Sequence, residues 1–180
     1  PRRQGHFIST FDTLAAFDLS LVVKFGVQFG LFGGSIFFLG TAHHHEKYLS
    51  KVCDLSLPGC FAMTERDHGS NVKALETTAI YDAGTDSIIV NTPTESAHKE
   101  YIGNAARHGK MATVFAQLYV EGECHGVHAV LVPIRDAEHQ PCDGVRIEDT
   151  GDKMVLAGVD NGRLWFDNVR VPRANLLNRY

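Results

Sequence analysis

The chain has 180 residues and a net charge of −4, and 44% of its residues are hydrophobic. This length and apolar content are enough to bury a core, and they fit one domain or one domain with part of another. The basic residues are scattered and the net charge is negative. No basic stripe is therefore available to neutralise phosphates, which argues against a nucleic-acid partner.

The first third of the chain has the periodicity of helices. Apolar residues recur at helical spacing over Phe11–Val23. Gly40 is a typical helix stop, and Thr41 can cap a further helix that runs from Ala42 to about Lys51. We therefore expect two or three helices before residue 58.

A long apolar run over Leu21–Leu39 is the candidate for a membrane-spanning segment in this chain. Lys24, Gln28 and several glycines interrupt the run, so we expect a buried helix and no membrane span. Glycine lowers helix stability, and here it is expected to permit close approach of another helix or a ligand. The glycines are Gly26, Gly30, Gly33 and Gly34.

From Pro58 onward the pattern changes to short alternating segments rich in β-branched residues, which predicts strands. These segments are Leu75–Tyr81, Ser87–Asn91, Met111–Val120, Gly126–Pro133, Val145–Glu148 and Arg163–Val171. Turn residues at 82–86 and 121–123 predict two hairpins. The sequence thus predicts an α+β fold, in which N-terminal helices precede an antiparallel β-barrel or sandwich.

Polar groups crowd the end of a short apolar, strand-like segment that begins at Cys60. The segment passes through Thr64 to a Gly-Ser turn at Ser70, and hydroxyl and amide groups there can donate several hydrogen bonds to a planar or anionic ligand. A second segment, Lys99–Ala106, has an aromatic residue followed by small ones. We expect the two segments to close on one cofactor. The alternative is that the polar side chains only cap backbone groups at the strand end.

Other kinds of site are not supported. The adjacent His43, His44 and His45 would point about 100° apart on a helix and cannot share one metal ion. The cluster Cys124–His128 offers too few ligands for a closed metal site. No glycine-rich nucleotide motif occurs, and His68–Val72 lacks the second glycine of a nucleophile elbow. We expect no metal site.

The cysteines have no CxxC spacing, and the sequence shows no signal peptide. We therefore expect reduced thiols in an intracellular protein that is not secreted. The cysteines are Cys53, Cys60, Cys124 and Cys142.

Several short motifs follow one another along the chain, and their order and spacing can be compared with known families. They are Ala62–Glu65 with Gly69 and Ser70, Tyr101–Ala105, Val159–Gly162 and Phe166–Arg173. Together they resemble the acyl-CoA dehydrogenase and oxidase superfamily, and the resemblance covers nearly all of the chain. Further motifs are most similar to the acyl-CoA oxidases, namely Pro93–Ala97, Val132–Arg135 and Asn175–Tyr180.

The resemblance implies a domain arrangement in which an N-terminal helical domain, a middle β-domain and C-terminal helices hold FAD between them. It places residues 1–57 in the helical domain and 58–173 in the middle β-barrel domain. Residues 174–180 would start the connection to a C-terminal helical domain that is absent from this chain. The family's catalytic base is a glutamate on a C-terminal helix and has no match here. The catalytic residues are therefore unassigned, and this chain alone is expected to be inactive.

The resemblance also implies four cofactor-binding residues. Thr64 would bond the flavin ring through its hydroxyl and backbone amide, and Ser70 would lie near the FAD pyrophosphate. Tyr101 would cover one face of the flavin. Gly103 matches the oxidase position whose backbone contacts the flavin, and its missing side chain would leave space for dioxygen. Glu100 departs from the family pattern, which has an aromatic residue there.

The implied activity is that of an FAD-dependent acyl-CoA oxidase of fatty acid β-oxidation. Such an enzyme converts a fatty acyl-CoA to the trans-2-enoyl-CoA and passes the electrons to dioxygen, giving hydrogen peroxide; the intact protein would be a homodimer. One alternative is a dehydrogenase that passes electrons to an electron-transfer flavoprotein. Another is a non-catalytic binding fragment, which Glu100 favours. The expected location is the cytoplasm for a bacterial protein and the peroxisome for a eukaryotic one.

Overall fold

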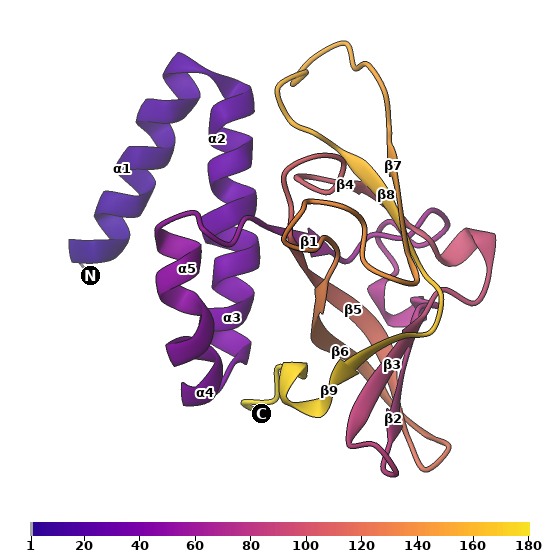
Figure 1. Ribbon diagram of the computed structural model, residues 1–180. Coiled ribbons are helices and arrows are strands. Elements are labelled where there is room, and N and C mark those ends of the chain that lie inside the picture. The colour runs from indigo at the N-terminus through magenta and orange to yellow at the C-terminus, as the bar shows by residue number, and fades with distance from the viewer. Residues whose placement is uncertain (1) are drawn as a thin grey trace.

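Helices and strands occupy separate parts of the chain, with the helices on one side of the sheets (Figure 1). The computed structural model describes the backbone of residues 2–180 and the side chains of residues 5–180. The helical segments up to Cys53 are followed by a first strand that begins at Gly59. This arrangement confirms the predicted α+β fold class.

Within the described residues the helical part has three continuous stretches. The first is α1 (Arg2–Phe17). The second comprises α2 (Leu19–Phe25), η1 (Gly26–Phe32) and α3 (Gly33–Leu39), and the third comprises α4 (Ala42–His44), η2 (His45–Leu49) and α5 (Ser50–Cys53). Gly40 ends the second stretch, and Thr41 caps the third through a capping box with His44. The predicted stop and cap are therefore confirmed.

The predicted helix over Phe11–Val23 is broken at Asp18. The backbone of Asp18 is extended, with φ −153° and ψ 116°, and its carboxylate accepts a hydrogen bond from the Leu21 N–H at 2.9 Å. An aspartate in this position satisfies one of the free N–H groups at a helix start, which favours ending one helix and beginning the next. Apolar residues continue on both sides of Asp18, so periodicity alone does not indicate the break.

The helix from Leu19 to Leu39 is long and apolar enough, by length and composition alone, to cross a membrane. In the folded protein, 39% of the most apolar 18-residue stretch of this helix is buried. Phe32 and Ile36 are fully buried in a core cluster shared with the third helical stretch and the strands. At Gly33 a Cβ would lie 3.0 Å from Val52 Cγ1, so the predicted role of a helix glycine in close packing is confirmed at this position.

Within residues 2–180 the strands form two sheets. One contains β1 (Gly59–Ala62), β2 (Thr78–Asp82), β3 (Ser87–Asn91), β5 (Met111–Val120), β6 (Glu123–Pro133) and β9 (Val169–Pro172). The other contains β4 (Lys99–Ile102), β8 (Gly162–Phe166) and β7 (Val145–Asp149), in that order. The short 3-10 turns are η3 (Val72–Ala74), η4 (Glu95–Ala97) and η5 (Arg173–Asn175). Apolar residues of both sheets join in one buried core cluster.

Strand β5 is the centre of the larger sheet. β6 pairs with it in antiparallel fashion along one edge. Along the other edge, β1 pairs in parallel with residues 111–114 and β2 pairs in parallel with residues 117–119. The larger sheet therefore contains parallel pairs in addition to the predicted antiparallel ones. Parallel partners need a long connection, and segment 63–110 supplies it between β1 and β5.

The predicted strand over Arg163–Val171 is two strands in different sheets. β8 pairs with β4 and β7, whereas β9 pairs with β3. Asn168, between them, has φ +50°. This left-handed conformation interrupts an extended strand, and Asn tolerates it better than most residues.

Both predicted hairpins are confirmed. β2 and β3 pair around residues 83–86, and β5 and β6 are joined by Glu121 and Gly122. In the second turn, φ is +51° at Glu121 and +83° at Gly122. Two positive φ angles in a two-residue loop fit a type I′ turn, whose twist matches that of the flanking strands.

Replacing Gly122 with alanine should destabilise the full-length protein by about 1 kcal/mol, because a Cβ is strained in the left-handed region. Nothing lies within 4 Å of the new methyl group, so the loss of stability would come from backbone strain alone. Gly69→Ala is the matched control, since it also has open space but lacks a positive φ, and it should be nearly neutral. Urea unfolding measures both variants. Equal losses of stability would contradict the assigned turn.

Candidate functional site

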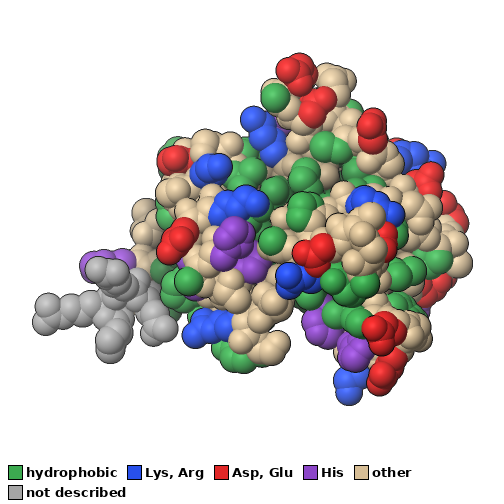
Figure 2. All heavy atoms as spheres, turned by 60° about the horizontal axis from the view of Figure 1, so that its bottom comes forward, with side chains coloured by type: hydrophobic (Ala, Val, Ile, Leu, Met, Phe, Trp, Pro, Cys, Tyr) green, Lys and Arg blue, Asp and Glu red, His purple; other side chains and the backbone are tan. Residues whose placement is uncertain are grey.

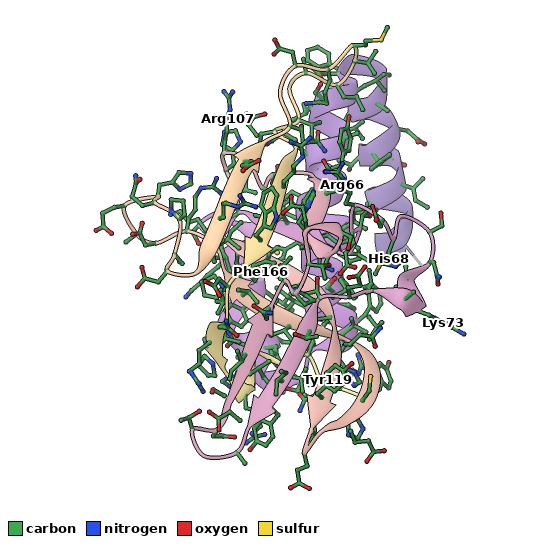
Figure 3. All side chains as sticks on the ribbon, turned by 90° about the vertical axis from the view of Figure 1, so that its right-hand side faces the viewer. Arg66, His68, Lys73, Arg107, Tyr119 and Phe166 are labelled. Atoms are coloured by element: carbon green, nitrogen blue, oxygen red, sulfur yellow. The ribbon has the colours of Figure 1, made fainter. Side chains whose placement is uncertain are left out.

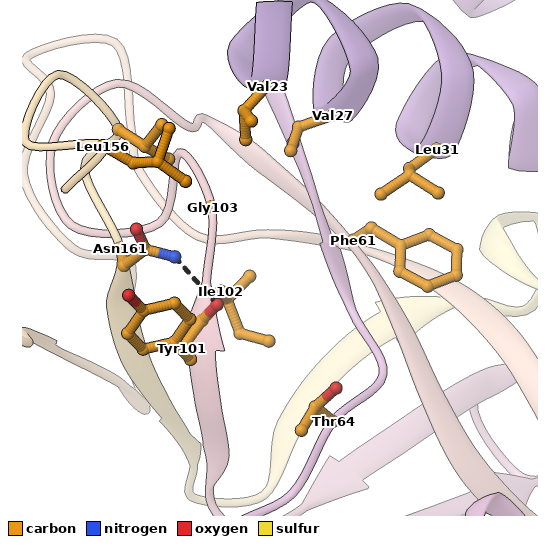
Figure 4. Close-up of a pocket in the computed structure, with 11 residues that line it drawn as sticks. Val23, Val27, Leu31, Phe61, Thr64, Tyr101, Ile102, Gly103, Leu156 and Asn161 are labelled. Atoms are coloured by element: carbon orange, nitrogen blue, oxygen red, sulfur yellow. Dashed lines mark hydrogen bonds between the residues drawn. The ribbon is translucent and has the colours of Figure 1, made fainter. Parts of the chain in front are cut away.

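A pocket of about 400 Å³ lies between the Leu19–Leu39 helix and the smaller sheet (Figure 4). It is lined by Val23, Val27, Leu31, Phe61, Thr64, Tyr101, Ile102, Gly103, Leu156, Val159 and Asn161. The two segments that were expected to close on one ligand meet here, one through Thr64 and the other through Tyr101 and Gly103. A mostly apolar lining with few polar groups is typical of a small-molecule site.

Thr64 follows the end of β1 and offers a free hydrogen-bond donor to the pocket. Its side chain is exposed, and its hydroxyl makes no hydrogen bond within residues 5–180. The Thr64 carbonyl is engaged instead, because it accepts a hydrogen bond from the Glu100 N–H at 3.0 Å. The backbone is thereby fixed to β4 while the hydroxyl remains available to a ligand.

Tyr101 has a strained backbone at the edge of the pocket. Its φ is +60°, and the ladder between β4 and β8 shifts register between Lys99 and Ile102. The Asn161 amide donates a hydrogen bond to the Tyr101 carbonyl at 3.0 Å, the dashed line in Figure 4. The Tyr101 side chain is 56% exposed, so its ring is free to cover a ligand. Strained residues of this kind cluster at functional sites.

Gly103 is packed tightly against the helix. A Cβ at this position would lie 3.1 Å from Val27 Cγ2 and 3.7 Å from Val159 Cγ1. The expectation that the missing side chain leaves open space for dioxygen is therefore wrong, because Val27 fills that space. The glycine instead permits the close approach of η1 to the turn that follows β4.

Ser70 does not line this pocket. It is exposed, and its carbonyl accepts a hydrogen bond from the Val72 N–H at 3.0 Å, at the start of η3. Arg66, His68 and Lys73, labelled in Figure 3, mark the course of this loop. The structure thus brings Thr64, Tyr101 and Gly103 together at the pocket and leaves Ser70 outside it.

Glu100 is absent from the pocket lining, although it precedes Tyr101 in the chain. Its carboxylate accepts hydrogen bonds at 2.9 Å from His98 Nε2 and from Arg163 Nε. Burial raises the pKa of the Glu100 carboxyl, but these hydrogen bonds outweigh it and hold that pKa below its usual value. The His98 ring in turn stacks on Trp165, with centroids 4.5 Å apart. Glu100 therefore belongs to a polar cluster outside the pocket.

Asp160 joins the loop before β8 to the helix, and sequence reasoning missed this role. Its carboxylate accepts hydrogen bonds from Lys24 Nζ and, at 2.9 Å, from the N–H groups of Arg107 and His108. Burial raises the pKa of this carboxyl, yet these donors hold it well below its usual value. The neighbouring Asn161 reaches the Tyr101 carbonyl. The motif Val159–Gly162 was the only sequence signal for these contacts.

Among residues 5–180, no three His, Cys, Asp or Glu side chains are placed to hold one metal ion. The four cysteines are free thiols. On the face shown in Figure 2, acidic and basic side chains are interspersed.

The strands that build this pocket match one known domain. The profile of the acyl-CoA dehydrogenase middle domain matches residues 60–169, which is more than half of the chain. The chain belongs to the acyl-CoA dehydrogenase family.

Within that family, the chain is similar to acyl-CoA oxidases. Acyl-coenzyme A oxidase 3, peroxisomal, from Arabidopsis thaliana is 47% identical over 178 residues, which cover 99% of this chain and 26% of the relative. Acyl-CoA oxidase3 from Yarrowia lipolytica is 41% identical, with a TM-score of 0.90 over 92% of this chain and 24% of that chain. Acyl-CoA oxidase-1 from Caenorhabditis elegans, complexed with FAD and ATP, is 37% identical, with a TM-score of 0.83 over 86% and 24%. The chain spans about a quarter of the length of these relatives.

Gly103→Ala should lower the free energy of unfolding of the full-length protein by about 1 kcal/mol, because the new Cβ forces Val27 or its helix to shift. Val27→Ala removes the obstructing methyl groups. The double variant should therefore be more stable than the sum of the two single changes predicts. Val22→Ala, at a buried position on the same helix, is the control. Its loss of stability should simply add to that of Gly103→Ala. Urea unfolding of the variants checks this, and strict additivity with Val27→Ala would contradict the contact.

Proposed function

We propose that the full-length protein containing this chain is an FAD-dependent acyl-CoA oxidase. It would convert a fatty acyl-CoA to the trans-2-enoyl-CoA and pass the electrons to dioxygen, producing hydrogen peroxide. The observation that carries the proposal is the joint placement of a free Thr64 hydroxyl and the exposed Tyr101 ring at one apolar pocket. The similarity to acyl-CoA oxidases over nearly the whole chain supports it.

The residues at the pocket fit a flavin ring. Thr64 provides a hydroxyl donor, and Tyr101 provides an aromatic surface for a planar ring. The helix side chains Val23, Val27 and Leu31 form an apolar wall along one side of the pocket. FAD, when bound, supplies the acceptor for the hydride removed from the substrate. A donor fixed at Thr64 would stabilise negative charge on the pyrimidine side of the ring. Ser70 would contact the pyrophosphate from outside the pocket.

We further propose that this chain supplies part of a larger assembly. Residues 1–57 would belong to an N-terminal helical domain and 58–173 to the middle β-domain, with 174–180 leading toward C-terminal helices. The catalytic base would come from those helices, and the intact protein would be a homodimer. Since several of the similar oxidases are named as peroxisomal, a eukaryotic protein of this kind would be peroxisomal.

The contacts of Glu100 weaken the alternative of a non-catalytic binding fragment. That alternative rested on a charged residue disturbing the cofactor site. Glu100 instead pairs with His98 and Arg163 and takes no part in the pocket lining. The remaining alternative is a dehydrogenase that passes its electrons to an electron-transfer flavoprotein.

Thr64→Val should weaken FAD binding by the worth of one hydrogen bond, about 0.5–1.5 kcal/mol or roughly 2–10-fold in Kd, because valine keeps the shape and removes the donor. Thr113→Val is the matched control. The Thr113 hydroxyl is buried without a hydrogen-bond partner in the described chain, so its removal should leave FAD affinity unchanged. Titration of the full-length apoprotein with FAD measures both. Equal Kd values for Thr64→Val and the unmodified protein would refute the contact.

Flavin reduced by a fatty acyl-CoA in the full-length protein should be reoxidised by dissolved dioxygen, with one hydrogen peroxide formed for each enoyl-CoA. Anaerobic mixing isolates the reduction, and subsequent mixing with aerated buffer isolates the reoxidation. Reduced flavin that is inert to dioxygen but is reoxidised by an electron-transfer flavoprotein would replace the oxidase assignment with the dehydrogenase one.

A further inference from the structure

Glu65 and Lys99 form an ion pair in which both side chains are fully buried. Lys99 Nζ lies 3.0 Å from Glu65 Oε1, and the two residues face each other in an isolated antiparallel bridge. Glu65 follows Thr64 directly, and Lys99 precedes Tyr101 by two residues. The pair therefore joins the two segments that carry the polar and aromatic members of the pocket.

The Lys99 ammonium group has an acceptor for each of its protons. Besides Glu65, it donates to the Met63 carbonyl at 3.1 Å and to the Phe115 carbonyl at 2.7 Å. Burial lowers the pKa of Lys99 to about 8, although the adjacent carboxylate raises it. Lys99 thereby ties β4 to β5 as well as to the end of β1.

The Glu65 carboxylate is equally well partnered. It accepts hydrogen bonds from the Glu76 N–H at 2.7 Å, the Thr77 N–H at 2.9 Å and the Thr77 hydroxyl at 2.6 Å. A buried ion pair often contributes no more stability than an apolar pair of similar volume. The consequence of this network is therefore geometric, because it fixes four separate segments relative to one another.

We propose that Glu65 and Lys99 are positioning residues that hold Thr64 and Tyr101 in the relative placement needed to bind FAD. This proposal rests on the proposed function, since it concerns that cofactor. Neither side chain lines the pocket, so both act through Thr64 and Tyr101 rather than by touching the ring. Replacing the pair should change how the flavin is held, beyond any change in stability.

The test uses the full-length protein and the double variant Glu65→Gln/Lys99→Met. This variant removes both charges together, nearly keeps the volume, and leaves an amide oxygen at residue 65 that can accept from the N–H and hydroxyl of Thr77. FAD titration of the apoprotein gives the Kd, and visible circular dichroism reports the surroundings of the bound flavin. We expect the Kd to rise at least tenfold and the flavin bands to change in shape or sign.

Val90→Ala is the matched control, because it removes methyl groups from a fully buried position in β3 that does not line the pocket. It should lower the melting temperature while leaving the FAD Kd within twofold and the flavin bands unchanged. If the double variant binds FAD like the unmodified protein, the positioning role is overturned. The same holds if Val90→Ala weakens FAD binding as much as the double variant does.

Thr77→Val keeps the proposal testable if the double variant does not fold. This change removes the hydroxyl donor to Glu65 and leaves no unpaired charge. It should raise the FAD Kd several-fold and alter the flavin bands, whereas an unchanged Kd and spectrum overturn the proposal. Unmodified protein that binds no FAD would refute the proposed function and the positioning role together. FAD-binding protein whose variants are unaffected would refute the positioning role alone.

Discussion

The backbone of strand β5 forms hydrogen-bonded ladders along both edges, and the arrangement of the larger sheet follows from this pairing. One edge carries two different strands in succession, because β1 and β2 are each only about half as long as β5. The end of β1 therefore comes close to the start of β2. This is why Glu65, just after β1, can accept hydrogen bonds from Glu76 and Thr77, just before β2. The same strand offers the Phe115 carbonyl to Lys99 of the smaller sheet.

The pocket depends on two local departures from regular structure. The left-handed backbone at Tyr101 directs an aromatic ring out of the β4–β8 ladder, and Asn161 supports it from the loop before β8. The glycine at 103 lets the helix approach until Val27 packs against the turn that follows β4. Asp160 then fastens that loop to Lys24 of the same helix. Helix, strand and loop are therefore fixed around the pocket by contacts that do not require a ligand.

Local patterns in the sequence were sufficient for some elements and not for others. Alternating β-branched residues gave the bounds of Ser87–Asn91 and Met111–Val120, and turn chemistry gave both hairpins. The parallel pairing on β5 could not be predicted, because it joins segments far apart in the chain. At the site, the polar pattern and the family resemblance indicated Thr64, Tyr101 and Gly103. Nothing local marked Val27 as the partner of Gly103, since that contact depends on how the helix packs. The role of Ser70 remains a prediction.

The stacking of Trp165 on His98 links the fluorescence of this tryptophan to the pairing of β4 with β8. Trp165 is the only tryptophan in the chain, so its fluorescence arises at a single position. Its ring also lies 3.7 Å from the Arg146 guanidinium carbon, and its indole N–H donates to Glu95 at 3.1 Å. His98 immediately precedes β4, whereas Trp165 lies in β8. Separation of these strands would remove the His98 ring from the half-buried indole, expose more of it to water and move its emission to longer wavelengths. The chain thus carries an intrinsic reporter of the strand that bears Tyr101.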